Sequence, residues 1–321
     1  MKRNLLAAAS IVALCTPIAA FADNTFTGSM TLGYSLGDVS ADGSSQDVNV
    51  ASFRADSRLI FSEALDMDLG FTALVVDLDG IPVDANIMAV DAALHYRFGG
   101  GWSVGAFVEN GDLDIDGSSI GTIAAISPEH QSYGVTLGYA AANWDVEGFI
   151  GSTEIDPLDV MVDYSVTNVG VSGTYRPSDA LTIGGHLTRS GISSGGTSAA
   201  AYSIGVGAFY DINEQFTVYG AVSKQWFDDF DVDADIVGTS IGVSYAMNDM
   251  MAFPATLSLE LVRNSLSLDT PGPVVDADFD EIRFGVSIPL GGGKPARPLN
   301  SHAYQTIGGH HDVVSAILPL Y

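Results

Sequence analysis

The chain has 321 residues, of which 47% are hydrophobic and only 16% charged, and its formal net charge is −27. This apolar content excludes an intrinsically disordered acidic protein. A surplus of 39 acids over 12 bases would repel the phosphates of a nucleic acid. Beyond the N-terminus, no apolar run reaches the ~18–20 residues that a membrane-spanning helix needs. The apolar residues are dispersed instead, as in strands.

The first 22 residues have the features of an export signal. Lys2 and Arg3 precede an apolar stretch from Leu5 to Ile18, and Ala20-Phe21-Ala22 has the form of a cleavage site. We therefore expect residues 1–22 to be removed as a signal peptide after export through an inner membrane. The mature chain then holds no cysteine and no disulfide.

From Asp23 to about residue 290, apolar residues alternate with small polar ones. In the first segment Phe26, Met30, Leu32 and Tyr34 share one face, while the other face carries Thr, Ser and Gly. Because successive side chains of a strand point to opposite faces, each segment has one apolar and one polar side. Fourteen strands are predicted, centred on 26–36, 53–61, 67–75, 88–98, 102–108, 133–139, 144–150, 169–175, 181–187, 202–210, 216–222, 237–245, 255–261 and 282–288.

The connections alternate between short turns and longer, acidic links. The short turns are 62–66, 99–101, 140–143, 176–180, 211–215 and 246–254, and the links are 38–47, 77–86, 112–129, 154–165, 190–199, 225–235 and 264–280. The links contain 23 of the 39 acids and none of the bases, so the end that they form is strongly negative. Short turns at one end and long links at the other are typical of an up-and-down membrane barrel.

A soluble β-sandwich is the alternative fold. Its polar faces would be rich in Lys and Glu, whereas here they carry Gly, Ser and Thr, and aromatic residues gather at the strand ends. Rings at the two ends of strands are favoured at lipid–water interfaces. We therefore predict an all-β fold, an antiparallel up-and-down transmembrane β-barrel of about 14 strands (12–16 admissible) over residues 23–290.

The export signal, the acidic links and the aromatic strand ends resemble those of Gram-negative outer-membrane porins, most nearly the α-proteobacterial type. The resemblance covers roughly residues 23–290, although the usual porin has sixteen strands where this chain has 14. It implies the cell outer membrane as the location, with lipids and lipopolysaccharide as partners and a homotrimer as one assembly. It also implies a passive diffusion channel for small hydrophilic solutes and ions, with no catalytic activity, cofactor or metal.

The link 112–129 is a candidate constriction, because the third external loop of porins folds into the barrel. Asp112, Asp114 and Asp116 begin it and share one face of an extended chain. By the parity of the preceding strand this is the outer face, so a twist or bulge near Gly111 is required to turn the three acids into the lumen.

Basic residues on the polar face are expected opposite those acids. Arg54, Arg58 and Arg283 fall on that face, and acid facing base across a pore sets its ion selectivity. The alternative, in which Arg54, Asp56 and Arg58 simply pair with one another, stays open. Two further residues of the polar face, Asp91 and His186, complete the predicted pore lining.

Arg189, Lys224 and Arg263 lie on the apolar face near the outer end of their strands. Each follows the first lipid-facing residue of its strand by eight positions, a rise of about 20 Å in a tilted strand. Two roles stay open for them: contacts with lipopolysaccharide phosphates, or snorkelling of long side chains at the interface.

Two other classes of function are alternatives to a cation-preferring channel. His130 with Asp228 and Asp229 would serve a rim-active outer-membrane hydrolase, and a filled lumen would make a non-conducting structural or adhesion barrel. The run from Asp112 to Gly117 opens like a calcium loop, but Ile123 stands where the bidentate Glu is required. No metal or cofactor site is predicted.

The tail, residues 291–321, breaks the strand pattern. Pro289, Pro295, Pro298 and the glycines at 291–293 cannot continue a paired strand. We expect the tail to leave the barrel as a periplasmic segment that channel formation does not need. A plug in the lumen, docking under the barrel, and two extra strands at 299–307 and 312–321 are the alternatives.

Overall fold

The computed structural model describes residues 25–41, 43–78, 84–116, 129–156, 164–194, 197–228, 233–247, 254–269, 275–291 and 296–308. The signal peptide predicted at 1–22 lies outside these ranges. The elements are β1 (Thr25–Ala41), β2 (Ser44–Ile60), β3 (Leu65–Leu78), β4 (Asp84–Phe98), η1 (Gly99–Gly101), β5 (Trp102–Asp116), β6 (Glu129–Ala140), β7 (Trp144–Asp156), β8 (Tyr164–Ser178), β9 (Leu181–Ser194), β10 (Thr197–Asp211), β11 (Phe216–Asp228), β12 (Asp233–Ala246), β13 (Thr256–Asp269), β14 (Val275–Leu290) and α3 (His302–Gly308). No helix within the described residues is long and apolar enough to cross a membrane.

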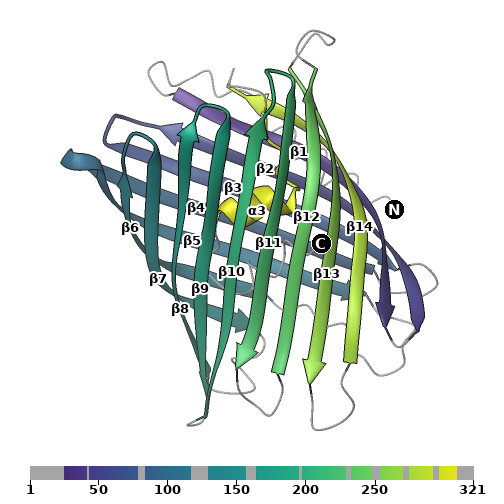
Figure 1. The fold of residues 1–321 in the computed structure, drawn as a ribbon. Coiled ribbons are helices and arrows are strands. Elements are labelled where there is room, and N and C mark those ends of the chain that lie inside the picture. The colour runs from purple at the N-terminus through teal and green to yellow at the C-terminus, as the bar shows by residue number, and fades with distance from the viewer. Residues whose placement is uncertain are drawn as a thin grey trace.

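The strands form one closed antiparallel barrel in which every strand pairs with its neighbours in sequence (Figure 1). The seam joins β1 to β14, with Gly28 opposite Leu290 and Ala41 opposite Ala277. Closure leaves no strand edge without a partner, so no row of backbone donors and acceptors is left unpaired. The predicted fold class, including the count of 14 strands, is confirmed.

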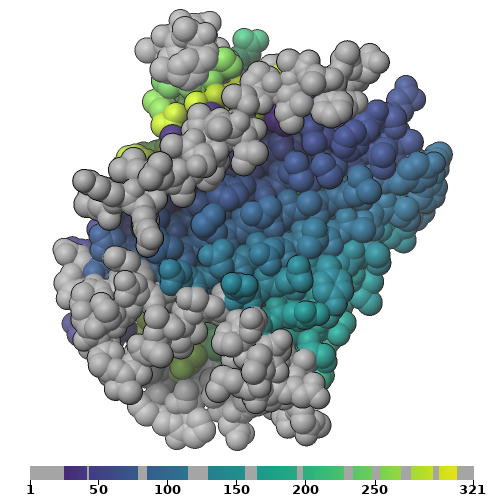
Figure 2. All heavy atoms as spheres, turned by 180° about the vertical axis from the view of Figure 1, so that it is seen from behind, coloured from purple at the N-terminus to yellow at the C-terminus, as the bar shows by residue number. Residues whose placement is uncertain are grey.

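The two faces of the wall differ as the alternation predicts. Forty large apolar side chains are exposed among the described residues, and Ile241 reaches 67% exposure. In Figure 2 the strands coloured blue to teal form an unbroken outer surface. The inner face carries buried polar residues such as Thr31, Ser132 and Asn168. The barrel is therefore apolar outside and polar inside.

Aromatic side chains cluster towards both ends of the strands. Near the short turns, the ring centroid of Tyr139 lies 5.0 Å from that of Trp102 and 5.1 Å from that of Trp144. Towards the other end, Tyr202 and Trp226 stack with 5.0 Å between centroids and 9° between planes. These are the packed pairs that aromatic girdles require.

Several predicted links prove to be strand. β1 and β2 run to Ala41 and from Ser44, with Gly43 at φ +78° in the turn, where residues 38–47 had been predicted as a link. Similar extensions shorten the links at 190–199, 225–235 and 264–280. A 17-residue strand tilted by ~40° rises about 43 Å, well beyond the ~25 Å apolar band. Beyond that band both faces of a strand meet water, so charged residues are tolerated there and the strand continues through them.

The prediction that the tail leaves the barrel is wrong for residues 296–308. Figure 1 shows α3 enclosed by the ring of strands, about midway between its ends. The helix contacts β8 to β12, and Ala303 and Leu299 are buried. The chain therefore turns back into the lumen after β14, and we call residues 296–308 the luminal segment.

Candidate functional site in the lumen

The luminal segment begins at the barrel seam. The Leu299 backbone N–H donates to Thr31 Oγ1 over 3.1 Å, and Thr31 Oγ1 lies 2.7 Å from Ser287 Oγ. Asn300 forms two hydrogen bonds with β14. Its backbone carbonyl accepts from Arg283 Nη1 at 3.3 Å, and its side-chain amide donates to the Phe284 carbonyl at 3.1 Å. These bonds satisfy the Leu299 backbone N–H and the Asn300 backbone carbonyl, which have no strand partner.

Two side chains accept hydrogen bonds from backbone N–H groups in the first turn of α3. Ser301 Oγ accepts the Tyr304 backbone N–H at 3.1 Å, the arrangement of a helix N-cap. Glu260 on β13 accepts the His302 backbone N–H at 3.1 Å, and its side chain is only 2% exposed. A buried carboxylate at this position is stabilised by the exposed donors of the first turn. The wall thus fixes the direction of the helix.

The opposite side of α3 is anchored to other strands. Tyr304 donates its hydroxyl to Asp56 Oδ2 on β2 at 2.8 Å. His186 Nδ1 lies 2.8 Å from the Thr306 carbonyl, which can only accept, so Nδ1 carries the proton. His302 Nε2 lies 2.9 Å from Ser223 Oγ on β11. The luminal segment is therefore held across the lumen, from the seam to β2, β9 and β11.

Glycines on the inner face leave room for α3. A Cβ on Gly205 would lie 2.5 Å from Thr306 Cγ2, and one on Gly207 would lie 3.0 Å from the Ala303 carbonyl oxygen. Gly184 contacts the segment in the same way. Glycine inside a strand often marks such a close approach of another backbone.

Two cavities remain beside the luminal segment. The first, of about 600 Å³, is lined by β1 to β5 and the segment. The second, of about 500 Å³, is lined by β2 to β10 and the segment, and it reaches the short-turn end. Both are lined by Arg58, Asp68, Tyr304 and Gly308. The cavities therefore meet and define a polar path along one side of the segment.

Four predicted pore-lining residues lie in the first cavity. Arg54, Asp56, Arg58 and Asp91 all line it, together with two further acids, Asp68 and Glu109. The proposed pairing among Arg54, Asp56 and Arg58 does not hold for Arg58, because its guanidinium forms two 2.6 Å hydrogen bonds with Asp68 on β3. Two bases and four acids face this cavity, which leaves an excess of negative charge.

The predicted acids of the constriction face the wrong way. β5 pairs with β4 in unbroken register through Gly111, so no bulge turns the chain there. Asp112 and Asp114 are exposed and keep the outward parity of the strand. The side chain of Asp116 and residues 117–128 lie outside the described part. Acids of β2 to β5 line the path instead.

Arg283 and His186 lie under the luminal segment rather than on the path. Arg283 is 3% exposed and is paired with Glu281 and the Asn300 carbonyl. His186 lies between Thr306 and Ser203 Oγ, 2.9 Å from the latter. Both residues are luminal as predicted, but they anchor the segment.

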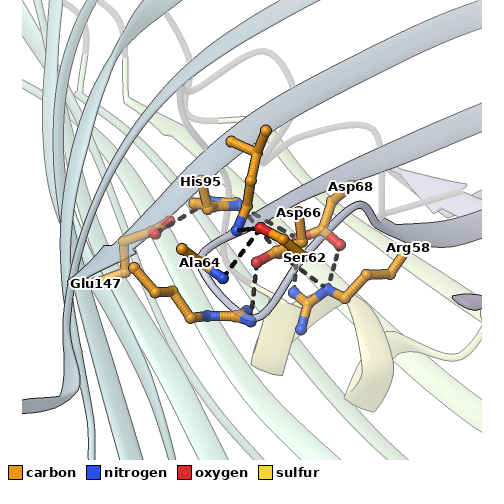
Figure 3. A network of polar contacts seen from close by, with 9 residues as sticks. Arg58, Ser62, Ala64, Asp66, Asp68, His95 and Glu147 are labelled. Atoms are coloured by element: carbon orange, nitrogen blue, oxygen red, sulfur yellow. Dashed lines mark hydrogen bonds and ion pairs between the residues drawn. The ribbon is translucent and has the colours of Figure 1, made fainter. Parts of the chain in front are cut away.

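A polar network at the short-turn end was not predicted (Figure 3). Asp66, which is fully buried, forms an ion pair of 2.8 Å with Arg97. His95 lies opposite Asp66 in the β3–β4 register and points its Nε2 at Glu147 on β7, 3.3 Å away. Asp66 ends the predicted 62–66 turn, and His95 comes shortly before the predicted 99–101 turn. Both turns lie at the same end of the barrel, and this was the available signal that the two side chains are close together.

The rim bases are already in contact with neighbouring side chains. Arg189 Nε donates to the Tyr202 hydroxyl at 3.4 Å, Lys224 lies 2.9 Å from Asp235, and Arg263 lies 2.6 Å from Asp278. All three bases are exposed on the outer face. Carboxylates therefore offset much of the positive charge of Lys224 and Arg263.

Of the residues proposed for a hydrolase, only His130 has its side chain in the described part. His130 is buried in the lumen, with Nε2 3.4 Å from Glu109 Oε1. The side chain of Asp228 and the whole of Asp229 lie outside the described part. The Ser–His contacts of His186 and His302 are likewise buried beneath the luminal segment.

No known protein family matches this chain, and no curated protein matches it. Solved structures share its architecture. The TodX monoaromatic hydrocarbon channel deltaS2 mutant is 9% identical with a TM-score of 0.54, over 85% of this chain and 92% of that one. A Pseudomonas aeruginosa FadL homologue is 10% identical with a TM-score of 0.51, over 82% and 90%. The anion-selective porin from Comamonas acidovorans is 9% identical with a TM-score of 0.50, over 83% and 100%. Identities this low show the shared barrel fold alone.

Replacing Gly205 with Val should displace α3, because the new side chain would overlap Thr306. The readout is the labelling rate of a cysteine introduced by Ala303→Cys, at a position that is fully buried. We expect labelling to accelerate in Gly205→Val but not in the control Gly148→Ala, where the added Cβ would lie in ordinary contact, 3.7 Å from the Gly170 carbonyl oxygen. Equal rates in the two variants would contradict the close packing of α3 on β10.

Acid should loosen the luminal segment. Burial, followed by the nearby positive charge of Arg283, lowers the pKa of His302 to about 3, from ~6.5 in an exposed chain. A histidine held neutral favours docking fully above pH ~6.5 and loses that contribution as the pH falls towards 3, by about 1.4 kcal/mol per unit. Labelling of Ala303→Cys, normalised to a free thiol, should therefore accelerate below pH 6. His302→Gln should flatten this dependence; an unchanged pH profile in that variant would refute it.

Proposed function

We propose that this chain is an outer-membrane channel for passive diffusion of small hydrophilic solutes and ions, narrowed by its own luminal segment. The observation that carries the proposal is the pair of joined cavities beside that segment, lined by charged and polar side chains. A path of this kind offers dissolved ions replacement partners for water.

A membrane location is supported by the distribution of polarity over the barrel. Forty exposed large apolar side chains would be costly in water, whereas closed barrels satisfy their backbone groups inside lipid. The export signal expected at residues 1–22 directs the chain out of the cytoplasm. We therefore place the barrel in the outer membrane, with the short turns on the periplasmic side.

Cation preference follows from the charges along the path. The predicted links hold 23 acids and no bases. The first cavity has four acids against two arginines, and the second has three acids against four arginines, so the negative charge is concentrated in the links and the first cavity. Negative potential raises the local concentration of cations and repels anions. The preference should weaken at high ionic strength, because screening shortens the reach of these charges.

Lipid contact at the outer rim is a further part of the proposal. Arg189 is exposed on the outer face, and no carboxylate pairs with it among the described contacts. Tyr202 and Trp226 stack beside it. A guanidinium next to interfacial aromatic rings suits the phosphates of lipopolysaccharide.

Truncation after Gly291 tests the channel directly. The β1–β14 ladder ends at Leu290, so the barrel should still fold and keep its heat-resistant mobility in gels. Single-channel conductance in planar bilayers should rise severalfold, because the luminal segment no longer fills part of the lumen. A folded truncation with no conductance would support a non-conducting barrel, and loss of folding would show that the segment is essential to the wall.

Asp91→Asn should reduce cation selectivity without changing the fold. Asp91 lines the first cavity, so removing its charge weakens attraction of cations inside the lumen. Asp114→Asn is the matched control, because that exposed acid lies on the outward face of β5. Reversal potentials in a salt gradient should shift more for Asp91→Asn than for Asp114→Asn. Equal shifts would assign selectivity to the mouth rather than to the cavity.

A further inference from the structure

The network at the short-turn end contains an unusual histidine. Glu147 can only accept a hydrogen bond, so the His95 Nε2 that faces it at 3.3 Å carries a proton. The other ring nitrogen, Nδ1, is buried and has no hydrogen-bond partner. It faces two carboxylates, Asp66 Oδ1 at 3.8 Å and Asp68 Oδ2 at 3.6 Å (Figure 3). On a neutral imidazole, this is a lone pair directed at two anions.

Asp66 adds an independent sign of a missing partner. Its side chain is fully buried, and neither oxygen accepts a hydrogen bond. Oδ2 is ion-paired with Arg97 at 2.8 Å, but the ion-pair neighbours of Oδ1 are Arg58 Nε at 3.6 Å and His95 Nδ1 at 3.8 Å. A buried carboxylate oxygen without a donor is costly. Asp66 Oδ1 and His95 Nδ1 therefore lie 3.8 Å apart with no hydrogen-bond donor for the first and no hydrogen-bond partner for the second.

We propose that Asp66, Asp68 and His95 bind a divalent transition-metal ion of the zinc class. Their three ligand atoms lie within 4.8 Å of one another. Two ligands each ~2.1 Å from a tetrahedral zinc ion are about 3.4 Å apart, so a small contraction around the ion completes the set. One nitrogen with two carboxylate oxygens suits zinc, cobalt or nickel rather than calcium or magnesium.

The surrounding groups have the roles that metal sites require. Glu147 receives the second ring N–H of His95, which fixes the ring and makes Nδ1 more basic. Arg97 holds Asp66, and Arg58 holds Asp68. The two guanidiniums are 43% and 45% exposed, so water screens much of their repulsion of a bound cation.

The second cavity lies beside the site. Asp68, His95 and Glu147 line the second cavity, which leaves space for water as a fourth ligand. The sequence predicted no metal site, because Asp66 and His95 are 29 positions apart and meet only through strand pairing. Metal binding at equilibrium requires no transport, so this inference stands or falls separately from the proposed channel.

The experiment uses the untagged full-length chain in detergent, stripped with a chelator. His310→Ala and His311→Ala form the background, because adjacent histidines bind metals on their own. Calorimetric titration with Zn²⁺, and visible absorption with Co²⁺, should show one saturable site. His95→Gln, whose amide still reaches Glu147, should weaken it by about tenfold or more. The matched control His130→Gln, at a luminal histidine that faces a single carboxylate, should bind as the parent does.

Two results would overturn the inference. The first is no saturable binding in the parent background, which would mean that a protonated His95 neutralises the two carboxylates. The second is a failure of the comparison between variants: either His95→Gln binds Zn²⁺ as tightly as the parent does, or His130→Gln loses as much affinity as His95→Gln. Heat-resistant mobility controls for folding, and if His95→Gln does not fold, Asp68→Asn decides by the same criterion, because its side chain is 32% exposed and tolerates the exchange.

Discussion

The width of the barrel is the constraint on which the rest of this structure depends. Eight strands make a barrel that side chains can fill, whereas 14 strands enclose more space. Here the inner face carries mainly Gly, Ser and Thr, so the wall cannot fill that space by itself. The chain fills part of it with residues 296–308, which bring their own backbone groups to be satisfied. The described residues leave two joined polar cavities along one side of this segment.

Buried charge ties the luminal segment to the wall. Arg283 is paired with Glu281 on β14, and the segment adds the Asn300 carbonyl to Arg283 and the His302 N–H to Glu260. Removing one partner of such a set leaves a buried charge uncompensated. The anchored side of the lumen is therefore structural. The charged side chains that line the first cavity, Asp91 among them, lie on the opposite side.

The sequence was sufficient for the wall but not for what the wall encloses. Period-2 alternation predicts the strand count and the two faces, because one apolar face per strand is a local property. The tail was misplaced because α3 is short, and its contacts are made with residues far away in the chain. One signal was available: Gly205 and Gly207 stand on the inner face where a second backbone approaches. The acids at 112–116 were misassigned because an assumed bulge was preferred to the parity of β5.

An engineered disulfide tests the position of the luminal segment most directly. A Cβ on Gly205 would lie 2.5 Å from Thr306 Cγ2. Thr306→Cys removes this methyl group, so the overlap expected in Gly205→Val does not arise, and the two β-carbons come into the range of a disulfide. We expect Gly205→Cys with Thr306→Cys to oxidise readily within one chain in intact membranes, and a proteolytic digest to recover the two segments linked. Two thiols that stay reduced and reactive in a correctly folded barrel would contradict a C-terminal segment inside the lumen.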